Sequence, residues 1–410
     1  MNRRLAATVL AAFRQQHADG LRAQFAPFEE RDWLRTAEWL HTSGMALYFL
    51  GRAKTLGIED VMPVRMLRGL EQNHAENRVR SEDLFREFVT INAALQRAGV
   101  TYLNLKGFTL TPRACPDPTY RYQHDLDFLV CRRNAEQCRQ AVERHGYRLT
   151  AVSGHTWEFR AGNAEAPTMR DLYKVRLQRS LEVHVIPEGE GQGGRLSRMQ
   201  LQVWNGFEFP ALSDCDALLA QAQHLFKHFQ TEWTRTAWML EYATAIRSHG
   251  TDEDFWRETV AAIEAAPERK VGIGLANLIT RRAFGVEVPA GFRACTVDAV
   301  RGPLRLWVDR YQDEVVFTEH PGSKLYLLLR DVLLQGQPDW KDERRRKLFP
   351  SRLPPVTMPP ARTEDVWLRA RTAWARFCFV GSRLRFHVTE GLHYKVEAAR
   401  WRRMVADLRA

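Results

Sequence analysis

The stretch LKGFTLTPRACPDPTYRYQHDLDFLV, residues 105–130, decides what kind of fold this sequence adopts. Its last six residues, DLDFLV, alternate in polarity, as expected of a β-strand whose successive side chains point to opposite faces. Leu126, Phe128 and Val130 therefore face a core, while Asp125 and Asp127 lie side by side on the other face. Two such carboxylates repel each other unless a cation or a proton lies between them, and their hard oxygen atoms suit Mg²⁺ or Mn²⁺.

A second strand-like stretch, LEVHVI at residues 181–186, supplies a further carboxylate. Its two valines take the core face, and Glu182 and His184 share the other face. A third carboxylate beside the aspartate pair completes the set used by two-metal sites for displacement at phosphorus. Other strand registers remain open, with Glu158 and Asp171 as alternative third carboxylates.

The turn Leu105-Lys106-Gly107 joins a predicted strand to a short helix ahead of the acidic strand. Backbone N–H groups at such a turn can hold phosphate oxygens, and Gly107 allows a phosphate to approach closely. Lys106 adds a positive charge. The turn and the acidic strands together predict a site for a phosphate-bearing ligand and a divalent cation.

Outward from this stretch, the pattern of the chain changes twice. Helical periodicity extends to about residue 98 and includes a long helix over 64–97, which ends near Gly99. We then predict strands over 100–105, 125–130, 147–152, 155–160, 171–177 and 181–186, with a helix over 133–145. After the glycine-rich loop 189–194, helices return from Ser213, interrupted by an extended, proline-rich connection over 349–361.

This order predicts an α+β fold. A small mixed-sheet module, residues 99–206, is expected between an N-terminal helical region, residues 1–98, and a C-terminal helical region, residues 207–410. The first residues, MNRRLAATVLAAF, are basic and then apolar, and we interpret them as a buried amphipathic helix.

The composition excludes several classes of protein. The 410 residues are 45% hydrophobic and 27% charged, which is typical of an ordinary globular chain rather than a disordered one. There is no run of 18 apolar residues, so we predict no membrane-spanning helix. The six cysteines include no C-x-x-C pair, which argues against a zinc site or a disulfide framework and predicts a reducing, cytoplasmic location.

The net charge of +11 favours an anionic substrate or partner. Only 9 of the 60 basic residues are lysines, and the arginines are spread through helical patterns. No basic run is interleaved with exposed-looking aromatic residues, as it is in proteins that follow a nucleic-acid backbone. Nucleic acid therefore remains possible but is not the favoured partner.

The Leu105-Lys106-Gly107 turn and the acidic strands resemble those of the nucleotidyltransferase superfamily related to DNA polymerase β, and more closely those of its family of uncharacterised nucleotidyltransferases. That family has an LKG turn, a Pro-Asp-Pro-like tract, an Arg, a D-x-D strand, an "ELH" strand and a helix with two histidines four residues apart. The matching residues are Leu105-Lys106-Gly107, Pro116-Asp117-Pro118, Arg121, Asp125-Leu126-Asp127, Glu182-Val183-His184, His224 and His228. The resemblance covers residues 100 to about 245, with a departure at Glu241, where the family has Asp.

The resemblance implies transfer of a nucleoside monophosphate from an NTP to an acceptor, with release of pyrophosphate. It implies catalytic and Mg²⁺- or Mn²⁺-binding roles for Asp125, Asp127 and Glu182, and nucleotide-binding roles for Lys106, Gly107, Arg121 and His184. We expect a small-molecule or peptide acceptor. Such transfer depends mainly on positioning and charge neutralisation.

Other interpretations of these residues and of the function stay open. Arg121 either binds the triphosphate or forms a salt bridge to the acidic strand. His184 contacts the nucleotide, holds Glu182 in place, or is an ordinary partly buried histidine. We interpret His224 and His228 as packing residues or as residues that support the site from behind its ligands, because no Glu follows His224 to make a zinc motif. The whole protein is alternatively a catalytically silent binding protein with this fold, or an enzyme that acts on tRNA or another RNA.

Overall fold

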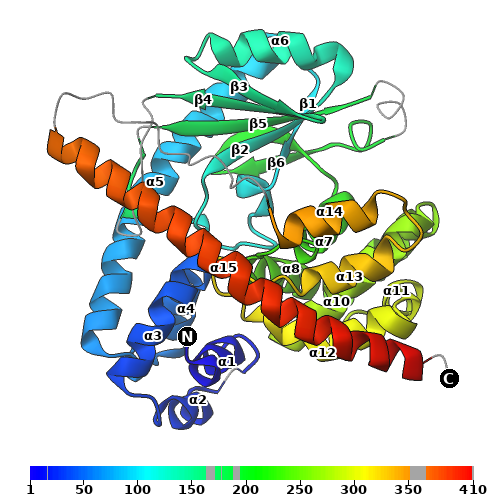
Figure 1. Ribbon diagram of the computed structural model, residues 1–410. Helices are drawn as coiled ribbons and strands as arrows, with labels where there is room; N and C mark the ends of the chain where they lie inside the picture. The colour runs from blue at the N-terminus through cyan, green and yellow to red at the C-terminus, as the bar shows by residue number, and fades with distance from the viewer. Residues whose placement is uncertain (16, 163–170, 177, 188–193, 351–365, 409–410) are drawn as a thin grey trace.

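Five helices build the N-terminal part of the computed structural model (Figure 1), which describes residues 1–15, 17–162, 171–176, 178–187, 194–350 and 366–408. They are α1 (Arg3–Ala11), α2 (Ala18–Phe25), α3 (Glu30–Thr42), α4 (Met45–Leu56) and α5 (Val64–Arg97). The buried apolar side of α1 confirms the predicted amphipathic helix. α5 spans the predicted range, and Gly99 follows it with φ +67°, a conformation that glycine adopts without steric cost.

A mixed sheet of seven strands forms the central module. The strands are β1 (Tyr102–Leu105), β2 (Asp125–Cys131), β3 (Arg148–Ser153), β4 (Thr156–Ala161), β5 (Arg179–Ile186), β6 (Gln200–Trp204) and β7 (Phe207–Ala211). Their order is β3-β4-β5-β2-β1-β7-β6. The β2–β5 and β1–β7 pairs are parallel, and the other neighbours are antiparallel. This sheet between two helical regions confirms the predicted α+β class.

The two faces of β2 lie in different surroundings, as its alternating sequence predicts. Leu126, Phe128 and Val130 pack with apolar residues of β5 and α5 and with α6 (Arg132–Glu143), which covers that face in Figure 1. Burying each such side chain contributes about 1.5–3 kcal/mol to folding. On the other face, Leu129 and Cys131 belong to a smaller cluster with residues of α7 (Asp214–Phe229). Asp125 and Asp127, at the start of β2, lie on the same face as Leu129 and Cys131.

Two strand predictions differ from the structure. Residues 171–176 form a turn rather than a strand, because Lys174 N–H donates to the Asp171 carbonyl and the two side chains form an ion pair. The β6–β7 hairpin was not predicted, although its turn is Asn205-Gly206, both at positive φ, which is a common hairpin signal. β7 carries the sheet to Ala211. The division of the chain at 98/99 and 206/207 stays a prediction, and the loops expected over 189–194 and 349–361 lie largely outside the described residues.

The C-terminal part is helical, and its helices share a core with the N-terminal ones. It contains α7, α8 (Thr236–His249), α9 (Glu253–Glu264), α10 (Lys270–Phe284), α11 (Ala290–Thr296), α12 (Gly302–Val316), α13 (Tyr326–Leu333), α14 (Trp340–Leu348) and α15 (Val366–Asp407). Buried residues such as Trp33 and Phe49 from one end belong to the same cluster as Leu218 and Trp307 from the other. The sheet is therefore set on a single helical base.

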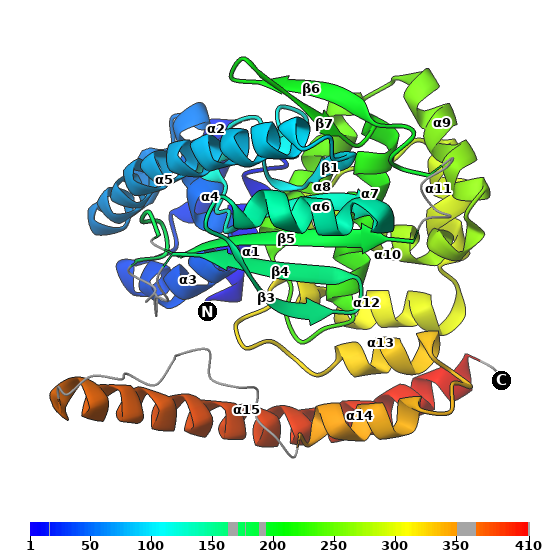
Figure 2. The same ribbon diagram turned by 90° about the horizontal axis from the view of Figure 1, so that it is seen from above.

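α15 runs along one side of the molecule (Figures 1 and 2). Its second half is tied to the helical base, because Tyr394 Oη donates to Asp331 on α13 at 3.2 Å and Tyr311 on α12 donates to Glu397 at 3.1 Å. Within the described parts of the chain, no helix, the 42-residue α15 included, is both long enough and apolar enough to cross a membrane.

Candidate active site

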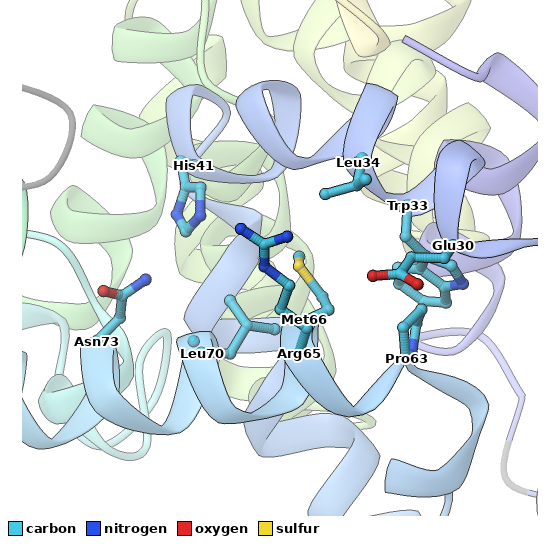
Figure 3. A pocket seen from close by; sticks show the side chains of 10 residues that line it. Glu30, Trp33, Leu34, His41, Pro63, Arg65, Met66, Leu70 and Asn73 are labelled. Atoms are coloured by element: carbon cyan, nitrogen blue, oxygen red, sulfur yellow. The ribbon is translucent and has the colours of Figure 1, made fainter.

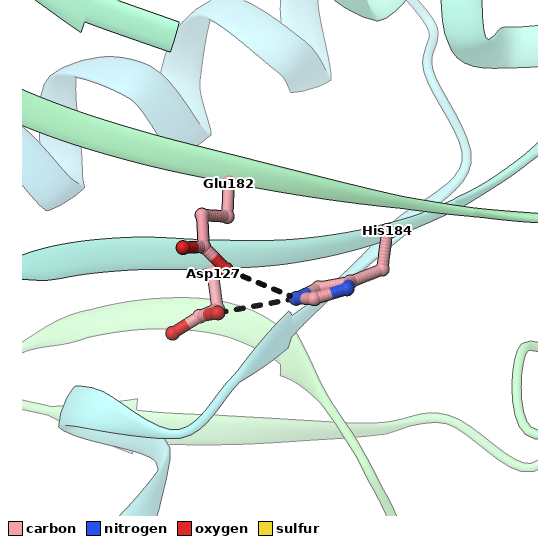
Figure 4. A group of neighbouring side chains, drawn as sticks. All are labelled: Asp127, Glu182 and His184. Carbon is pink, nitrogen blue, oxygen red and sulfur yellow. Dashed lines mark hydrogen bonds and ion pairs between the residues drawn. The ribbon is translucent and has the colours of Figure 1, made fainter. Parts of the chain in front are cut away.

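Three side chains from two parallel strands converge at the polar face of the sheet (Figure 4). Asp127 on β2 is paired in register with Glu182 on β5, and His184 follows two residues later on the same face. His184 Nε2 lies 3.2 Å from Asp127 Oδ1 and 3.7 Å from Glu182 Oε2. One potential ligand atom from each of the three lies within 4.8 Å of the others. We call Asp127, Glu182 and His184 the acidic cluster.

The orientation of His184 is set from the neighbouring strand. Thr156 on β4 is paired with His184, and its Oγ1 lies 3.2 Å from the ring Nδ1. When this hydroxyl donates to Nδ1, the proton of the neutral ring is on Nε2 and points at the Asp127 carboxylate. The His184 ring therefore lies between Thr156 and the two carboxylates, and its predicted contact with a nucleotide stays a prediction.

Asp125 lies two residues before Asp127 on the same face, opposite Ser180 of β5. Burial and the nearby charge of Asp127 raise its pKa above the ordinary value for aspartate. The three atoms within 4.8 Å nevertheless come from Asp127, Glu182 and His184, so the structure adds the histidine to the expected set. Metal binding by Asp125 stays a prediction.

The Lys106-Gly107 turn brings a positive charge to the cluster. β1 ends with Leu105 opposite Asp127, and the next residue, Lys106, places its Nζ 2.8 Å from Asp127 Oδ1. Burial disfavours the ammonium, but the charge and hydrogen bond of Asp127 outweigh burial and raise the pKa of Lys106. The hydrogen bond from His184 and the charge of Lys106 likewise outweigh burial at Asp127 and lower its pKa. Asp127 is thus held as a carboxylate.

The backbone of this turn has an unusual conformation. Lys106 has φ +54° and ψ −158°, a region that residues with a Cβ rarely adopt. Gly107 also has φ +54°, and a Cβ there would overlap the side-chain amide of Gln123. The glycine is therefore required by the close approach of Gln123 as well as by its dihedral angle.

The alternative third carboxylates lie elsewhere. Glu158 on β4 is opposite Glu182, one strand farther from Asp127. Asp171 lies in the turn of residues 171–176 and pairs with Lys174 at 3.1 Å. The carboxylate that the sheet places beside Asp127 is Glu182, as the LEVHVI alternation indicated.

Arg121 has a protein partner, although not one on the acidic strand. Its Nε lies 2.9 Å from Glu241 Oε1 on α8, and the Tyr48 hydroxyl donates to the same oxygen at 2.9 Å. Both charged residues are buried. Sequence reasoning did not find this pair because 120 positions separate the partners. The predicted triphosphate contact of Arg121 stays a prediction.

His224 and His228 lie one turn apart on α7 and pack as expected. Their ring centroids are 4.5 Å apart, and both contact the Trp238 ring, at 4.6 and 4.4 Å. Burial is the main cause that lowers the pKa of His224 to about 2 and that of His228 to about 4. Both rings are therefore neutral near pH 7 and serve the packing of α7 against α8.

The acidic cluster fits a divalent cation by the chemistry of its donor atoms. Two carboxylates and one imidazole are close enough to share an ion, and Asp127 is kept charged by Lys106 and His184. Carboxylate oxygens suit Mg²⁺ and Mn²⁺, whereas His184 Nε2 would become a ligand only with the ring proton on Nδ1, and not while it donates to Asp127. The residues present thus agree with the ions expected from the sequence.

A separate cavity lies between α3 and α5 (Figure 3), with a volume of about 180 Å³. Apolar residues such as Trp33 and Leu70 line it together with His41, whose Nδ1 lies 3.0 Å from the Tyr173 hydroxyl. None of the predicted site residues lines this cavity. We therefore place the candidate chemistry at the sheet and not here.

Comparison with family models identifies the family of this sequence. The family model described as uncharacterised nucleotidyltransferase matches residues 29–279, which include the sheet, α7 to α9 and most of α10. The crystal structure of an antigenic nucleotidyltransferase-like protein from Paracoccidioides brasiliensis matches with 12% identity over 51% of this chain and 94% of that one, at a TM-score of 0.29. No curated protein matches. Because the family model covers more than half of the sequence, the chain belongs to the uncharacterised nucleotidyltransferase family.

Proposed function

We propose that this protein is a metal-dependent enzyme that transfers a nucleoside monophosphate from an NTP to a small-molecule or peptide acceptor. The observation that carries the proposal is the acidic cluster, in which Asp127 and Glu182 are adjacent on parallel strands and Lys106 reaches Asp127. Family membership supports the general class of nucleotidyltransferase. The acidic residues would have no evident use in a silent binding protein.

The chemistry asks for charge neutralisation and alignment. The acceptor atom forms a bond to the α-phosphorus, the bond from that phosphorus to the bridging oxygen breaks, and pyrophosphate leaves with the electron pair while the acceptor loses its proton. Asp125, Asp127 and Glu182 would hold Mg²⁺ or Mn²⁺, which neutralises phosphate charge and activates the acceptor. His184 orients the carboxylates, Lys106 contributes positive charge, and backbone N–H groups of the Lys106-Gly107 turn would receive phosphate oxygens, although the side of Gly107 that a Cβ would occupy is filled by Gln123.

The acceptor class follows from how the positive charge is used. Surface arginines pair with nearby acids, for example Arg139 with Glu136 and Glu143, and Arg282 with Asp313. Arginines committed to such pairs do not offer a continuous basic groove for a polynucleotide.

All six cysteines are free thiols, which supports a reducing cytoplasm as the place of action.

The test is label transfer from each of the four α-labelled NTPs, with Mg²⁺ or Mn²⁺, into small-molecule, protein and RNA fractions of a cell extract. We expect label in the small-molecule or protein fraction together with pyrophosphate release. Glu182→Gln should abolish both, whereas Glu158→Gln, one strand away in the same register, should retain them. Label in RNA would show that the proposed acceptor class is wrong. If pyrophosphate is released in none of the fractions when metal is added, the proposal is contradicted.

A further inference from the structure

Three arginines surround the segment that leads into β2 on the Asp125 side of the site. Arg80 on α5 and Arg176 both approach His124, with their Nη atoms 3.1 and 3.2 Å from its Nδ1. Arg235, the residue before α8, lies over the Tyr122 ring at 5.2 Å. Three elements that are distant in the sequence therefore deliver guanidinium groups to one place.

Arg80 is accounted for by the fold. It donates to the Leu172 carbonyl at 2.5 Å and to the Gln123 carbonyl at 2.6 Å. These bonds fasten the segment before β2 to α5 and to the turn of residues 171–176. Arg80 thus has its hydrogen-bond partners within the protein.

Arg235 differs from Arg80 in having no such partners. Its guanidinium lies among three aromatic rings, 5.2 Å from Tyr122, 5.4 Å from Trp233 and 5.6 Å from Trp238. Its Nε is closed to solvent and lacks a hydrogen-bond acceptor, and no ion pair or side-chain hydrogen bond of Arg235 occurs among the residues that the structure describes. A desolvated donor without a partner costs stability, so a group of this kind requires a reason other than folding.

Arg235 is acted on by the positive charges of Arg80 and Arg121 and by the carboxylates of Asp125 and Glu241. Burial and the charge of Arg121 lower the pKa of Arg235, while Asp125 and Glu241 oppose that shift. Glu241 is already paired with Arg121 at 2.9 Å. His124 adds no acidic or basic charge near pH 7, because burial and the neighbouring arginines lower its pKa to about 2. An anion bound here would relieve the repulsion.

We propose that Arg235 binds the phosphate oxygens of the β- and γ-phosphates, the part of the NTP that leaves as pyrophosphate. This inference rests on the proposed function, because it extends the same site from the acidic cluster past Asp125 to α8. A planar guanidinium can donate to two phosphate oxygens at once. Because the three rings already fix the plane of this guanidinium, it loses little conformational entropy when it binds an anion. The class of ligand is therefore a polyphosphate.

The experiment measures binding of inorganic pyrophosphate by calorimetry, with and without Mg²⁺, so that no acceptor or turnover is needed. Arg235→Gln should weaken binding at least about tenfold, as expected for loss of a charge-assisted contact, and Arg235→Lys should have an intermediate effect. The matched control is Arg305→Gln, which removes an exposed arginine paired with Asp309 and should leave affinity unchanged.

Thermal melting separates binding from folding. Loss of a guanidinium whose buried Nε lacks an acceptor should leave the melting temperature of free Arg235→Gln equal to or above that of the wild type, and pyrophosphate should stabilise the wild type more than the variant. Unchanged pyrophosphate affinity in Arg235→Gln would overturn the inference even if nucleotide transfer is found. Weakened affinity in a protein that transfers no nucleotide would support the anion site and refute the proposed function. If Arg235→Gln does not fold, unchanged affinity in a folded Arg235→Lys variant would overturn the inference.

Discussion

The acidic cluster and the buried pair of Arg121 and Glu241 are both groups of opposite charges, but they differ in access to water. At the cluster, the side chains of Glu182 and His184 are 30% and 27% exposed and that of Lys106, which pairs with Asp127, is 39% exposed, although Asp127 itself is only 3% exposed. Those of Arg121 and Glu241 are only 10% and 6% exposed. The first group can exchange a protein partner for a ligand, whereas the second is closed by the protein on every side.

This difference separates a site from a structural support. Charges that remain accessible can have their partners replaced at low cost, because water compensates for what is lost. A buried ion is compensated only by its partner, so the loss of either member exposes the full desolvation penalty of the other. We therefore expect variants of the cluster to affect activity, and variants of the buried pair to affect stability.

The largest effect is expected from Asp127→Asn. Asp127 accepts hydrogen bonds from both Lys106 and His184. Removing its charge should lower the transfer rate about 10⁴-fold, which corresponds to a rise of about 5 kcal/mol in the activation barrier. The isosteric amide should keep the fold, because Lys106 can turn to water. Initial rates of pyrophosphate release and thermal melting measure the two properties, with Asp171→Asn as the control in an exposed turn. A folded Asp127→Asn protein with wild-type rates would remove Asp127 from the chemistry.

Glu241→Ala should have the opposite profile. It leaves the Arg121 guanidinium buried without its carboxylate, which should lower the free energy of unfolding by about 3–5 kcal/mol. Urea denaturation gives this value. The double variant Arg121→Met with Glu241→Leu should recover most of the loss, because no uncompensated charge remains.

The same variants test whether Arg121 also binds the triphosphate. If the double variant is stable but its KM for NTP rises tenfold or more, Arg121 belongs to the site as well as to the support. An unchanged KM would assign it to the support alone.

Gly107→Ala tests the Lys106-Gly107 turn beside the acidic cluster. The positive φ and the overlap with Gln123 should together cost about 1–3 kcal/mol of stability and raise the KM for NTP. Gly99→Ala is the matched control, since Gly99 has φ +67° but nothing within 4 Å of an added Cβ. It should cost only about 1 kcal/mol and leave KM unchanged. Equal effects of the two variants would show that the contact with Gln123 is unimportant.

The smallest effect is expected from His41→Gln, which tests the pH dependence of stability at a residue outside both charged groups. Burial lowers the pKa of His41 from 6.5 to about 4, so the unfolded chain binds the proton more readily than the folded one. Its contribution to stability is present above pH 6.5 and is lost as the pH falls towards 4. Between pH 7.5 and pH 5, His41→Gln should reduce the loss of unfolding free energy by about 1–2 kcal/mol. Urea denaturation at both values measures it, and identical pH profiles for variant and wild type would contradict the burial argument.

Much of the sheet could be predicted from the sequence because alternation along a strand is a local property. The period of two in DLDFLV and LEVHVI gave the faces of Phe128, Val183, Asp127 and Glu182, which the structure confirms. The strand predicted over 171–177 was wrong because a turn can contain the same alternation. There the Asp171–Lys174 interaction and the contact of Tyr173 with Tyr122 determine the conformation instead.

The sequence by itself thus determined most of the local elements, the carboxylates proposed for the site and, through its motifs, the family. Only the tertiary structure decided which distant groups meet: Arg121 with Glu241, His184 with Asp127, and Arg235 with the rings of Tyr122 and Trp238. Strand alternation and helix periodicity are set by backbone geometry within a few residues. A long-range charge pair is set by packing of elements that are far apart in the chain, and a single sequence carries no periodic signal of it.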